Sequence, residues 1–418
     1  KQVQTREILS QPLTKRFFVA QFITNFGNGM SPIALAFGIL ALPNGSANLL
    51  GLVLGLTSAM FILMAPFGGV IADRYGRARV IGLTDILAGI VFSIQVAYFA
   101  SGYVPVAVLL IVNGCYGLLS GIFWPAITGI MPTIVPTAGL QKANAVNGLM
   151  KNSGLILGAA TAGFLIDAFG AAVTLGIDAF TFLLAGLLVY TLRHLTPVVA
   201  DSKNSMLDDL LHGWKVFTSF RWIVIGVISF SFIAMCWAAA ENVLGPLIAL
   251  EHFEGAKSWS LVITAESVGL LVGAILGIKV KFKYPIRFLQ ISTLAISFYI
   301  FSLAKPQSLI VIAFCAFLFG IVLDLWGTLW YTLMHRKVPQ DALSRVSAFD
   351  ALGSLIFKPV GLAIAAPLST LLGIQTLIYL LGTITVVATL APLLSSQIRN
   401  MQFEDSPSDQ VSFRRFSE

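Results

Sequence analysis

Charged residues are scarce in this chain of 418 residues: they make up 11% of it, whereas 57% of the residues are hydrophobic. A soluble domain averages about 25% charged residues, so the composition excludes an ordinary soluble protein. A membrane-spanning helix needs about 20 apolar residues, and the length leaves room for roughly a dozen such spans. The composition therefore predicts an all-α membrane protein.

Residue types that serve catalysis and metal binding are also scarce. The three cysteines fall within apolar runs at no metal-ligand spacing, so we expect reduced thiols. None of the four histidines pairs with a nucleophile at a recognised spacing. The sequence lacks the glycine-rich phosphate loop of ATP-driven pumps. We therefore predict no enzymatic activity, no cofactor and no metal. If the chain moves solutes across a membrane, we expect an ion gradient to supply the energy.

The apolar stretches divide into two groups of six around a polar stretch. We predict twelve transmembrane helices in two pseudo-symmetric six-helix bundles, with domains at 1–192, 193–221 (a cytoplasmic linker), 222–395 and 396–418 (a cytoplasmic tail). The predicted spans are 17–42, 48–72, 80–101, 103–131, 143–168, 170–192, 222–249, 258–278, 286–304, 307–334, 346–372 and 374–395.

Basic residues are distributed very unevenly between the two sides of these spans. Of the 26 lysines and arginines, only Lys257 and Lys305 fall in loops on one side, and Lys151 and Lys358 fall within spans. Lysine and arginine accumulate in cytoplasmic loops, so both termini are predicted to be cytoplasmic. The net charge of +7 follows from this bias, and we expect no nucleic-acid partner.

The linker contains one helical pattern. In "MLDDLLHGWKVF", apolar residues recur at helical spacing with charged residues on the other faces. This predicts a short helix on the cytoplasmic membrane surface, with a partner-binding helix as the alternative. The apolar positions are Leu207, Leu210, Leu211, Trp214 and Phe217.

An internal repeat relates the two halves. Residues 109–170 align without a gap with 312–373, so that Gly117 meets Gly320 and Gly158 meets Gly361. The repeat includes the loops "PTIVPTAGLQ" and "HRKVPQDALS". Parallel repeats of this kind are an architecture of transporters.

The loop between spans two and three reads "GGVIADRYGRARV". Its acid can pair with its arginines to form a cytoplasmic latch that breaks in another conformation, or the arginines can serve only as topology anchors. Asp85, one turn into span three, is a candidate partner for these arginines, with direct proton transfer as the alternative. The latch candidates are Gly69, Asp73, Arg74, Gly76, Arg77, Arg79 and Asp85.

This spacing of Gly69, Asp73, Arg74, Gly76 and Arg77 resembles the loop signature of the major facilitator superfamily. The stretches "FWPAITGIMPTIVPTAGLQKANAVNGL" and "HRKVPQDALSRVSAFDALGSL" resemble the exporter branch that includes macrolide-efflux and enterobactin-exporter-like proteins, the latter stretch its actinobacterial members. The resemblance implies a proton-driven, alternating-access exporter of the bacterial inner membrane.

Several positions depart from that branch. Asn28 stands where an acid is frequent in span one, and Ala159 stands where the glycine motif of span five has proline. Span four has Asn113 near the position of an arginine that many antiporters carry. These departures concern proton antiport and not the fold. The helix-packing glycines of the motif are Gly154, Gly158 and Gly163.

Ionisable residues within the spans need a partner or a function, because burial in lipid is costly. Asp324 in span ten and Lys358 in span eleven lie at similar depths, so we predict that they face each other. Two readings stay open: a static pair that fixes helix packing, or a pair that exchanges protons during transport. Glu241 near the outer end of span seven is a further coupling candidate.

The expected substrate cavity combines aromatic walls with a few polar groups, which suits a drug-sized amphipathic ligand. Lys151 can snorkel to the surface or attract an anionic substrate. The cavity candidates are Asn28, Asn113, Phe123, Trp124, Lys151, Trp326 and Trp330.

The sequence thus predicts a monomeric exporter of small amphipathic drugs or metabolites, with protons and membrane lipid as its other partners. The alternatives are an uptake carrier, a facilitator, a lipid or siderophore exporter, and a membrane sensor that does not transport.

Overall fold

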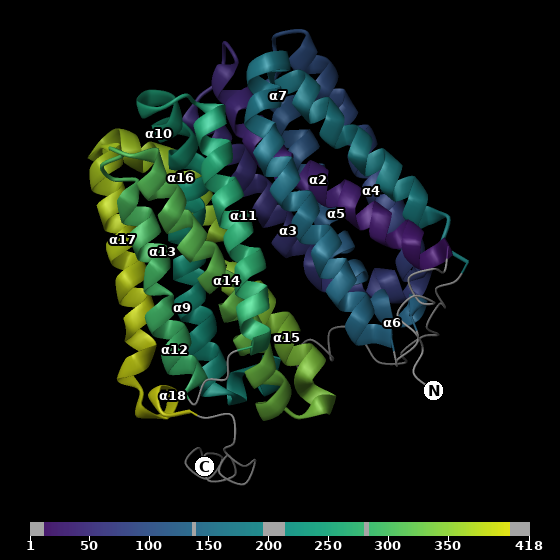
Figure 1. The fold of residues 1–418 in the computed structure, drawn as a ribbon, viewed down its shortest axis with the longest axis vertical. Coiled ribbons are helices and arrows are strands. Elements are labelled where there is room, and N and C mark those ends of the chain that lie inside the picture. The colour runs from purple at the N-terminus through teal and green to yellow at the C-terminus, as the bar shows by residue number, and fades with distance from the viewer. Residues whose placement is uncertain (1–11, 136–138, 195–213, 280–283, 402–418) are drawn as a thin grey trace.

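The structure, a computed structural model, describes residues 12–135, 139–194, 214–279 and 284–401. These residues form helices and short connections, with no strand among them. The helices lie in two groups side by side (Figure 1). We call residues 12–194 the N-terminal bundle and residues 214–401 the C-terminal bundle.

The N-terminal bundle contains long apolar helices joined by short turns. Its elements are α2 (Pro12–Ala41), α3 (Ala47–Tyr75), α4 (Arg77–Ala100), α5 (Val106–Thr128), α6 (Met131–Ile134) and α7 (Leu140–Tyr190). A straight helix of 51 residues would be about 77 Å long, far more than a bilayer core of about 30 Å. The break in α7 is at Gly170, whose φ of 82° is favourable only for glycine. The two parts of α7 correspond to predicted spans five and six.

The C-terminal bundle has more interruptions. Its elements are α9 (Arg221–Ala238), the π-helical turn η2 (Ala239–Leu244), α10 (Gly245–His252), α11 (Ala256–Lys279), α12 (Pro285–Ser292), α13 (Leu294–Ser302), α14 (Leu309–Lys337), α15 (Gln340–Leu355), α16 (Lys358–Leu372), α17 (Ile374–Leu390), η3 (Ala391–Leu394) and α18 (Ser396–Arg399). Predicted span eleven is therefore broken between Leu355 and Lys358. Pro359, at the start of α16, lacks the backbone N–H that a continuous helix would use.

Nine helical segments of the described residues are long and apolar enough to cross a membrane. They differ from the twelve predicted spans at three places: α2 is not among them, the broken α7 counts once, and 286–302 is a shorter apolar helix. The chain is an all-helical membrane protein, and the number twelve stays a prediction. Large apolar side chains cover its outer surface, as lipid contact requires; Ile310, Leu371 and Leu394 are each more than three-quarters exposed.

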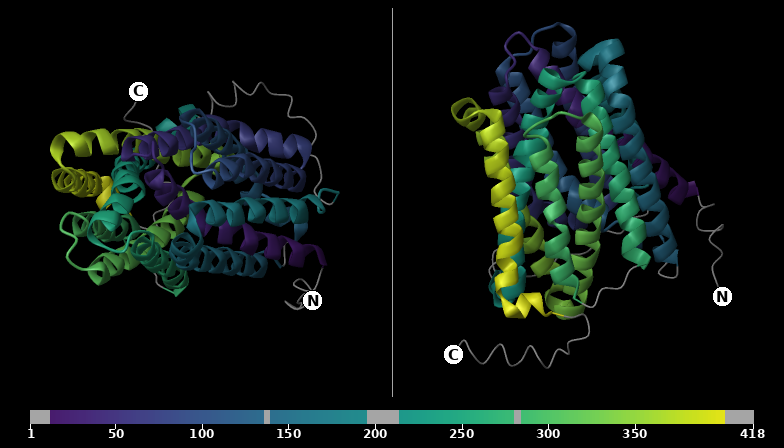
Figure 2. Two further views of the ribbon diagram at one scale, coloured as in Figure 1. Left: turned by 90° about the horizontal axis from the view of Figure 1, so that it is seen from above. Right: turned by 60° about the vertical axis from the view of Figure 1, so that its left-hand side comes forward.

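The two bundles meet closely at the predicted outer end of the spans. There α7 packs on α11, where a Cβ on Gly163 would lie 2.7 Å from the carbonyl oxygen of Ala256. Lys257 Nζ lies 2.7 Å from Asp167 Oδ2 across the same contact. The outer half of α3 packs on α16 in a second contact between the bundles. Toward the end that carries α6 and α15 the bundles diverge (Figure 1, Figure 2). The structure is therefore closed at the outer end.

Part of the predicted linker helix falls within the described residues. Residues 214–219 are helical, and the ring centroid of Phe217 lies 5.8 Å from that of Phe349 in α15. The linker therefore rejoins the fold by packing on the C-terminal bundle. The positions Leu207, Leu210 and Leu211 lie outside the described residues, as does most of the predicted tail.

Candidate functional site

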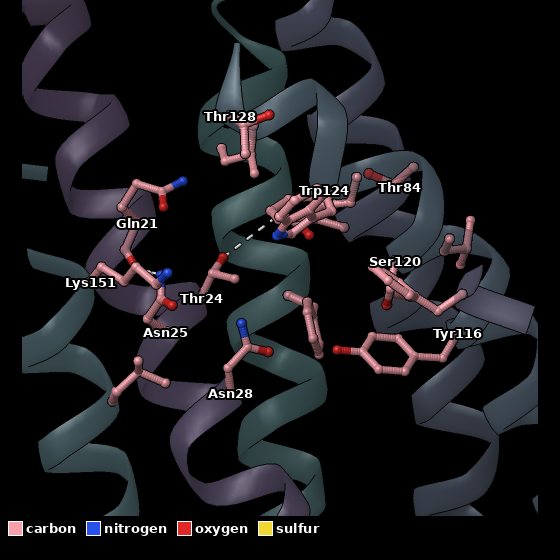
Figure 3. Close-up of a pocket in the computed structure, with 18 of the residues that line it drawn as sticks. Gln21, Thr24, Asn25, Asn28, Thr84, Tyr116, Ser120, Trp124, Thr128 and Lys151 are labelled. Atoms are coloured by element: carbon pink, nitrogen blue, oxygen red, sulfur yellow. Dashed lines mark hydrogen bonds between the residues drawn. The ribbon is translucent and has the colours of Figure 1, made fainter. Parts of the chain in front are cut away.

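A cavity of about 410 Å³ lies inside the N-terminal bundle, between α2, α3, α4, α5 and α7 (Figure 3). Its size is within the range of small-molecule sites in proteins. The residues that line it are Gln21, Thr24, Asn25, Asn28, Phe61, Thr84, Asp85, Ala88, Tyr116, Leu119, Ser120, Phe123, Trp124, Ile127, Thr128, Asn147, Lys151, Leu155 and Phe182.

One wall of the cavity is a polar stripe on α2. Gln21, Thr24, Asn25 and Asn28 follow the i, i+3, i+4, i+7 spacing that places side chains on one face of a helix. Figure 3 shows them along the same side of the cavity. The stripe offers amide and hydroxyl groups, which both donate and accept hydrogen bonds. Sequence reasoning identified only Asn28, although the same spacing was present in the sequence.

The opposite wall is largely aromatic and comes from α5. Tyr116, Phe123 and Trp124 line it, and Ser120 adds a hydroxyl group. Trp124 is 44% exposed and meets Phe61 of α3 edge to face, with 6.5 Å between the ring centroids. An exposed indole beside a cavity provides a flat surface for a ligand. Polar and aromatic walls that face each other fit an amphipathic molecule.

Asp85 is the one carboxylate among the residues that line the cavity. It is only 4% exposed, and the Thr24 hydroxyl donates a hydrogen bond to its Oδ2 at 3.5 Å. The prediction that Asp85 pairs with the loop arginines is therefore wrong. Its position about two turns into α4 turns the side chain inward between the helices, toward α2. A second buried acid, Asp178 of α7, lies close enough to interact with Asp85 and with Tyr116.

The predicted pair of Asp324 and Lys358 is also absent. The Nζ of Lys358 lies 6.0 Å from the ring centroid of Trp237, and the acid that interacts with it is Glu241. Asp324 lies instead within electrostatic range of Lys151, which lines the cavity across the divide between the bundles, but the two form no ion pair. The prediction assumed that consecutive spans are neighbours, whereas α16 packs on α9, η2 and α3, and α14 packs mainly on α11.

The tryptophans of span ten belong to a packed cluster rather than to the cavity. Trp326 and Trp330 stack on each other with 4.9 Å between their ring centroids. Trp330 is 2% exposed, and its Nε1 donates to Asp350 Oδ1 at 2.9 Å. Asn113 is likewise a packing residue, because its Nδ2 donates to Gln95 Oε1 at 2.7 Å. Of the seven cavity candidates, four line the cavity: Asn28, Phe123, Trp124 and Lys151.

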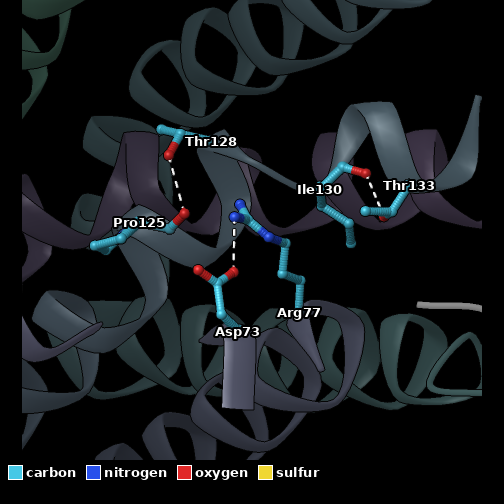
Figure 4. A network of polar contacts seen from close by, with 6 residues as sticks. All are labelled: Asp73, Arg77, Pro125, Thr128, Ile130 and Thr133. Atoms are coloured by element: carbon cyan, nitrogen blue, oxygen red, sulfur yellow. Dashed lines mark hydrogen bonds and ion pairs between the residues drawn. The ribbon is translucent and has the colours of Figure 1, made fainter. Parts of the chain in front are cut away.

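The loop between α3 and α4 holds an ion pair. Arg77 Nη2 donates to Asp73 Oδ1 at 2.8 Å (Figure 4). Gly76 has a φ of 89°, which lets α3 end and α4 begin with only this glycine between them. The Arg77 guanidinium lies against Gly129 at the end of α5, where a Cβ would overlap it. The loop is therefore seated on its own bundle in this structure.

The other loop residues are less constrained. Arg74 lies 5.9 Å from the ring centroid of Tyr75, and Arg79 is exposed. The close approach of α3 to α5 is at Gly68 rather than at Gly69, because a Cβ on Gly68 would lie 2.5 Å from the carbonyl oxygen of Gly121. A Cβ on Gly69 would meet only Pro125, at 3.9 Å.

The three glycines of span five have two different neighbours. Gly154 and Gly158 pack against the backbone of α2, which forms the cavity wall. Gly163 packs against α11 of the other bundle. One stripe of small residues therefore sets both the wall of the cavity and the contact between the bundles.

The chain belongs to the Major Facilitator Superfamily, whose model matches residues 17–356. It is 23% identical over 379 residues to the macrolide efflux protein A of Streptococcus pyogenes, covering 86% of this chain and 90% of that protein. It is 25% identical over 365 residues to the enterobactin exporter EntS of Salmonella typhi, covering 84% and 86%. The nucleoside transporter NupG has the same fold, with a TM-score of 0.75, 14% identity, and 91% and 99% of the chains covered. The resemblance to this superfamily and to these exporters is thus confirmed, and the chain is a transporter and not an enzyme.

Proposed function

We propose that the protein is a secondary active transporter that exports amphipathic solutes by alternating access, with the cavity of the N-terminal bundle as its substrate site. The observation that carries this proposal is the cavity itself, where a stripe of amides and hydroxyls on α2 faces the aromatic wall of α5. The exporters to which the chain is related support outward transport.

We further propose that protons drive this transport. The bundles hold acids in membrane-spanning helices, and such groups are costly unless they are paired or functional. Asp85 lines the cavity, and we infer that its carboxyl group contacts the substrate, which favours a cationic amphiphile as the substrate class. The protein acts as a monomer in the bacterial inner membrane in this proposal, with the domain limits that the sequence predicts.

A phenolic siderophore is the second candidate substrate. Lys151 is the one basic residue among those that line the cavity, and it is exposed there. An acidic amphiphile would approach this ammonium group, and the relative named as an enterobactin exporter has such a substrate.

The motif loop has a conformational role in this proposal. The Asp73–Arg77 pair holds the loop on the end of α5 while the inner ends of the bundles are apart. Closure of the inner end would bring the loop against the other bundle, so the loop contacts would differ between the two states.

Transport into proteoliposomes tests the proposal directly. Vesicles that contain the purified chain are assayed with ethidium, erythromycin and enterobactin, each with and without an imposed pH gradient. We expect ethidium to accumulate against its own concentration gradient only when the pH gradient is present. Equal fluxes with and without the gradient would indicate a facilitator. Saturable binding with no flux of any probe would indicate a sensor and overturn the proposal.

A further inference from the structure

A second group of buried ionisable residues lies in the C-terminal bundle, apart from the cavity. Glu241 of η2 is 6% exposed and Glu266 of α11 is 8% exposed. Their carboxyl groups interact with each other, and Trp237 and Tyr299 also approach Glu241. Lys358, at the start of α16, adds a positive charge near Glu241.

The hydrogen bonding of this group is incomplete without a proton. Among the described residues, no hydrogen-bond partner is found for Oε2 of Glu241, Oε2 of Glu266, the hydroxyl of Tyr299 or Nε1 of Trp237. An ionised carboxylate only accepts hydrogen bonds, so two carboxylates cannot bond to each other. The Tyr299 hydroxyl and Trp237 Nε1 are donors near Glu241, and one proton on either glutamate would let one carboxyl group donate to the other.

Charge balance also indicates one bound proton. Two glutamates and one lysine leave one net negative charge in a place lined by Trp237, Tyr299 and Phe319, whose rings pack together. A low-dielectric interior disfavours an unbalanced charge. A single bound proton makes the group neutral.

The backbone around the group is irregular on two sides. Glu241 sits in a π-helical turn, and Lys358 begins α16 just after the break that follows α15. Such irregularities are frequent at functional sites in membrane-spanning helices, where interrupted helices surround bound ions. The turn η2 also contacts α2 and α3 of the other bundle. The group is thus connected to the contact that must change when the bundles move.

We infer that Glu241 and Glu266 form a carboxyl pair that holds one exchangeable proton, with Lys358 as its internal counter-ion, and that this pair is the proton site of the exporter. Proton uptake forms an O–H bond on the pair with a proton from water on one side of the membrane. Release breaks that bond and gives the proton to water on the other side. This inference rests on the proposed function for its role in transport, but the bound proton can be measured without any transport.

The charged and titratable groups that face the pair are few. They are Glu266 on α11, Tyr299 on α13 and Lys358 on α16 around Glu241, with Cys315 of α14 beside Tyr299. The halves of α2 and α3 nearest η2 carry no charged residue. Apart from Lys358, therefore, these helices place no ionised residue beside a proton bound to the two glutamates.

Infrared spectroscopy of the purified full chain in lipid nanodiscs tests the pair without substrate. The carbonyl stretch of a protonated carboxylic acid is compared between the wild type, Glu266→Gln and the control Glu251→Gln, whose residue is exposed. We expect Glu266→Gln to lose one acid band, because Glu241 then pairs with Lys358 and needs no proton. The control keeps the band. A full acid band in Glu266→Gln overturns the inference.

A second variant keeps the test decisive if Glu266→Gln does not fold. Lys358→Met removes the counter-ion and leaves two carboxyl groups without a cation. The acid band is then expected to persist to higher pH than in the wild type. An unshifted titration of the band overturns the inference.

Transport then tests the role of the pair. In proteoliposomes, Glu266→Gln is expected to lose at least about nine-tenths of pH-driven ethidium accumulation while it retains exchange of ethidium without a gradient. Accumulation driven equally by a sodium gradient overturns the assignment to protons. A wild type that moves no ethidium under either condition counts against the proposed function, whereas the infrared result still decides whether the pair holds a proton.

Discussion

The interiors of the two bundles differ in how polar groups are placed. The N-terminal bundle is hollow, and its polar groups line the cavity, as the stripe from Gln21 to Asn28 shows. Both bundles bury acids, but Glu241 and Glu266 of the C-terminal bundle lie beside each other and beside Lys358, whereas Asp85 of the N-terminal bundle lines the cavity. A polar group that lines a cavity is available to a ligand, whereas two acids side by side away from that cavity need a proton or a cation between them. The difference suggests that one bundle binds substrate and the other binds the coupling ion.

Breaking the cavity wall should have the largest effect. A Cβ on Gly158 would overlap the carbonyl oxygen of Phe26 in α2, so Gly158→Leu should prevent the two helices from packing. We expect little monodisperse protein by fluorescence size-exclusion chromatography. The matched control is Gly148→Leu, because a Cβ at Gly148 meets nothing within 4 Å. Equal yields of the two variants would contradict this packing.

The acids of the two bundles should differ in their effect on substrate. Asp85→Asn removes the buried charge from the cavity, and we expect the ethidium concentration at half-maximal transport to rise about tenfold, as for the loss of about 1.4 kcal/mol of binding. Glu251→Gln is the control, since Glu251 is exposed on α10 and lies outside the lining. Similar changes in both variants would show that Asp85 has no special place in the site.

The tryptophans sharpen the same comparison. Trp124→Ala removes an exposed ring from the cavity, and a lost aromatic contact of about 1 kcal/mol should weaken ethidium transport about fivefold at low concentration. Trp326→Ala should instead lower the melting temperature, because Trp326 stacks on Phe230 and Trp330. A loss of stability in Trp124→Ala with unchanged transport would reverse the two assignments.

The smallest effect is expected at the outer contact between the bundles. The side chains of Lys257 and Asp167 are 44% and 60% exposed, so water weakens their attraction. A double-mutant cycle of Lys257→Ala and Asp167→Ala should give almost no coupling in the free energy of unfolding. A clearly larger coupling would mean that the ion pair, and not the packing at Gly163, holds the outer end closed.

Local patterns in the sequence were sufficient for the fold. Apolar runs predicted the helices, and the break of α7 at Gly170 agrees with the predicted boundary between spans five and six. The spacing of Asp73, Gly76 and Arg77 indicated the superfamily. These features depend on residues close together in the chain, so the sequence alone predicts them.

The partners of the buried charges were decided only by tertiary structure. Successive residues of a helix point about 100° apart, so a small error in helix rotation sends a side chain to another neighbour. Depth along the helices suggested that Asp324 meets Lys358, but packing leaves Lys151 as the cation within electrostatic range of Asp324 and Glu241 as the acid within range of Lys358. Packing likewise turns Asp85 from the arginine loop into the cavity. The sequence determined that this protein is a helical transporter of the membrane, and the tertiary structure decided which of its charges meet, because those contacts join residues far apart in the chain.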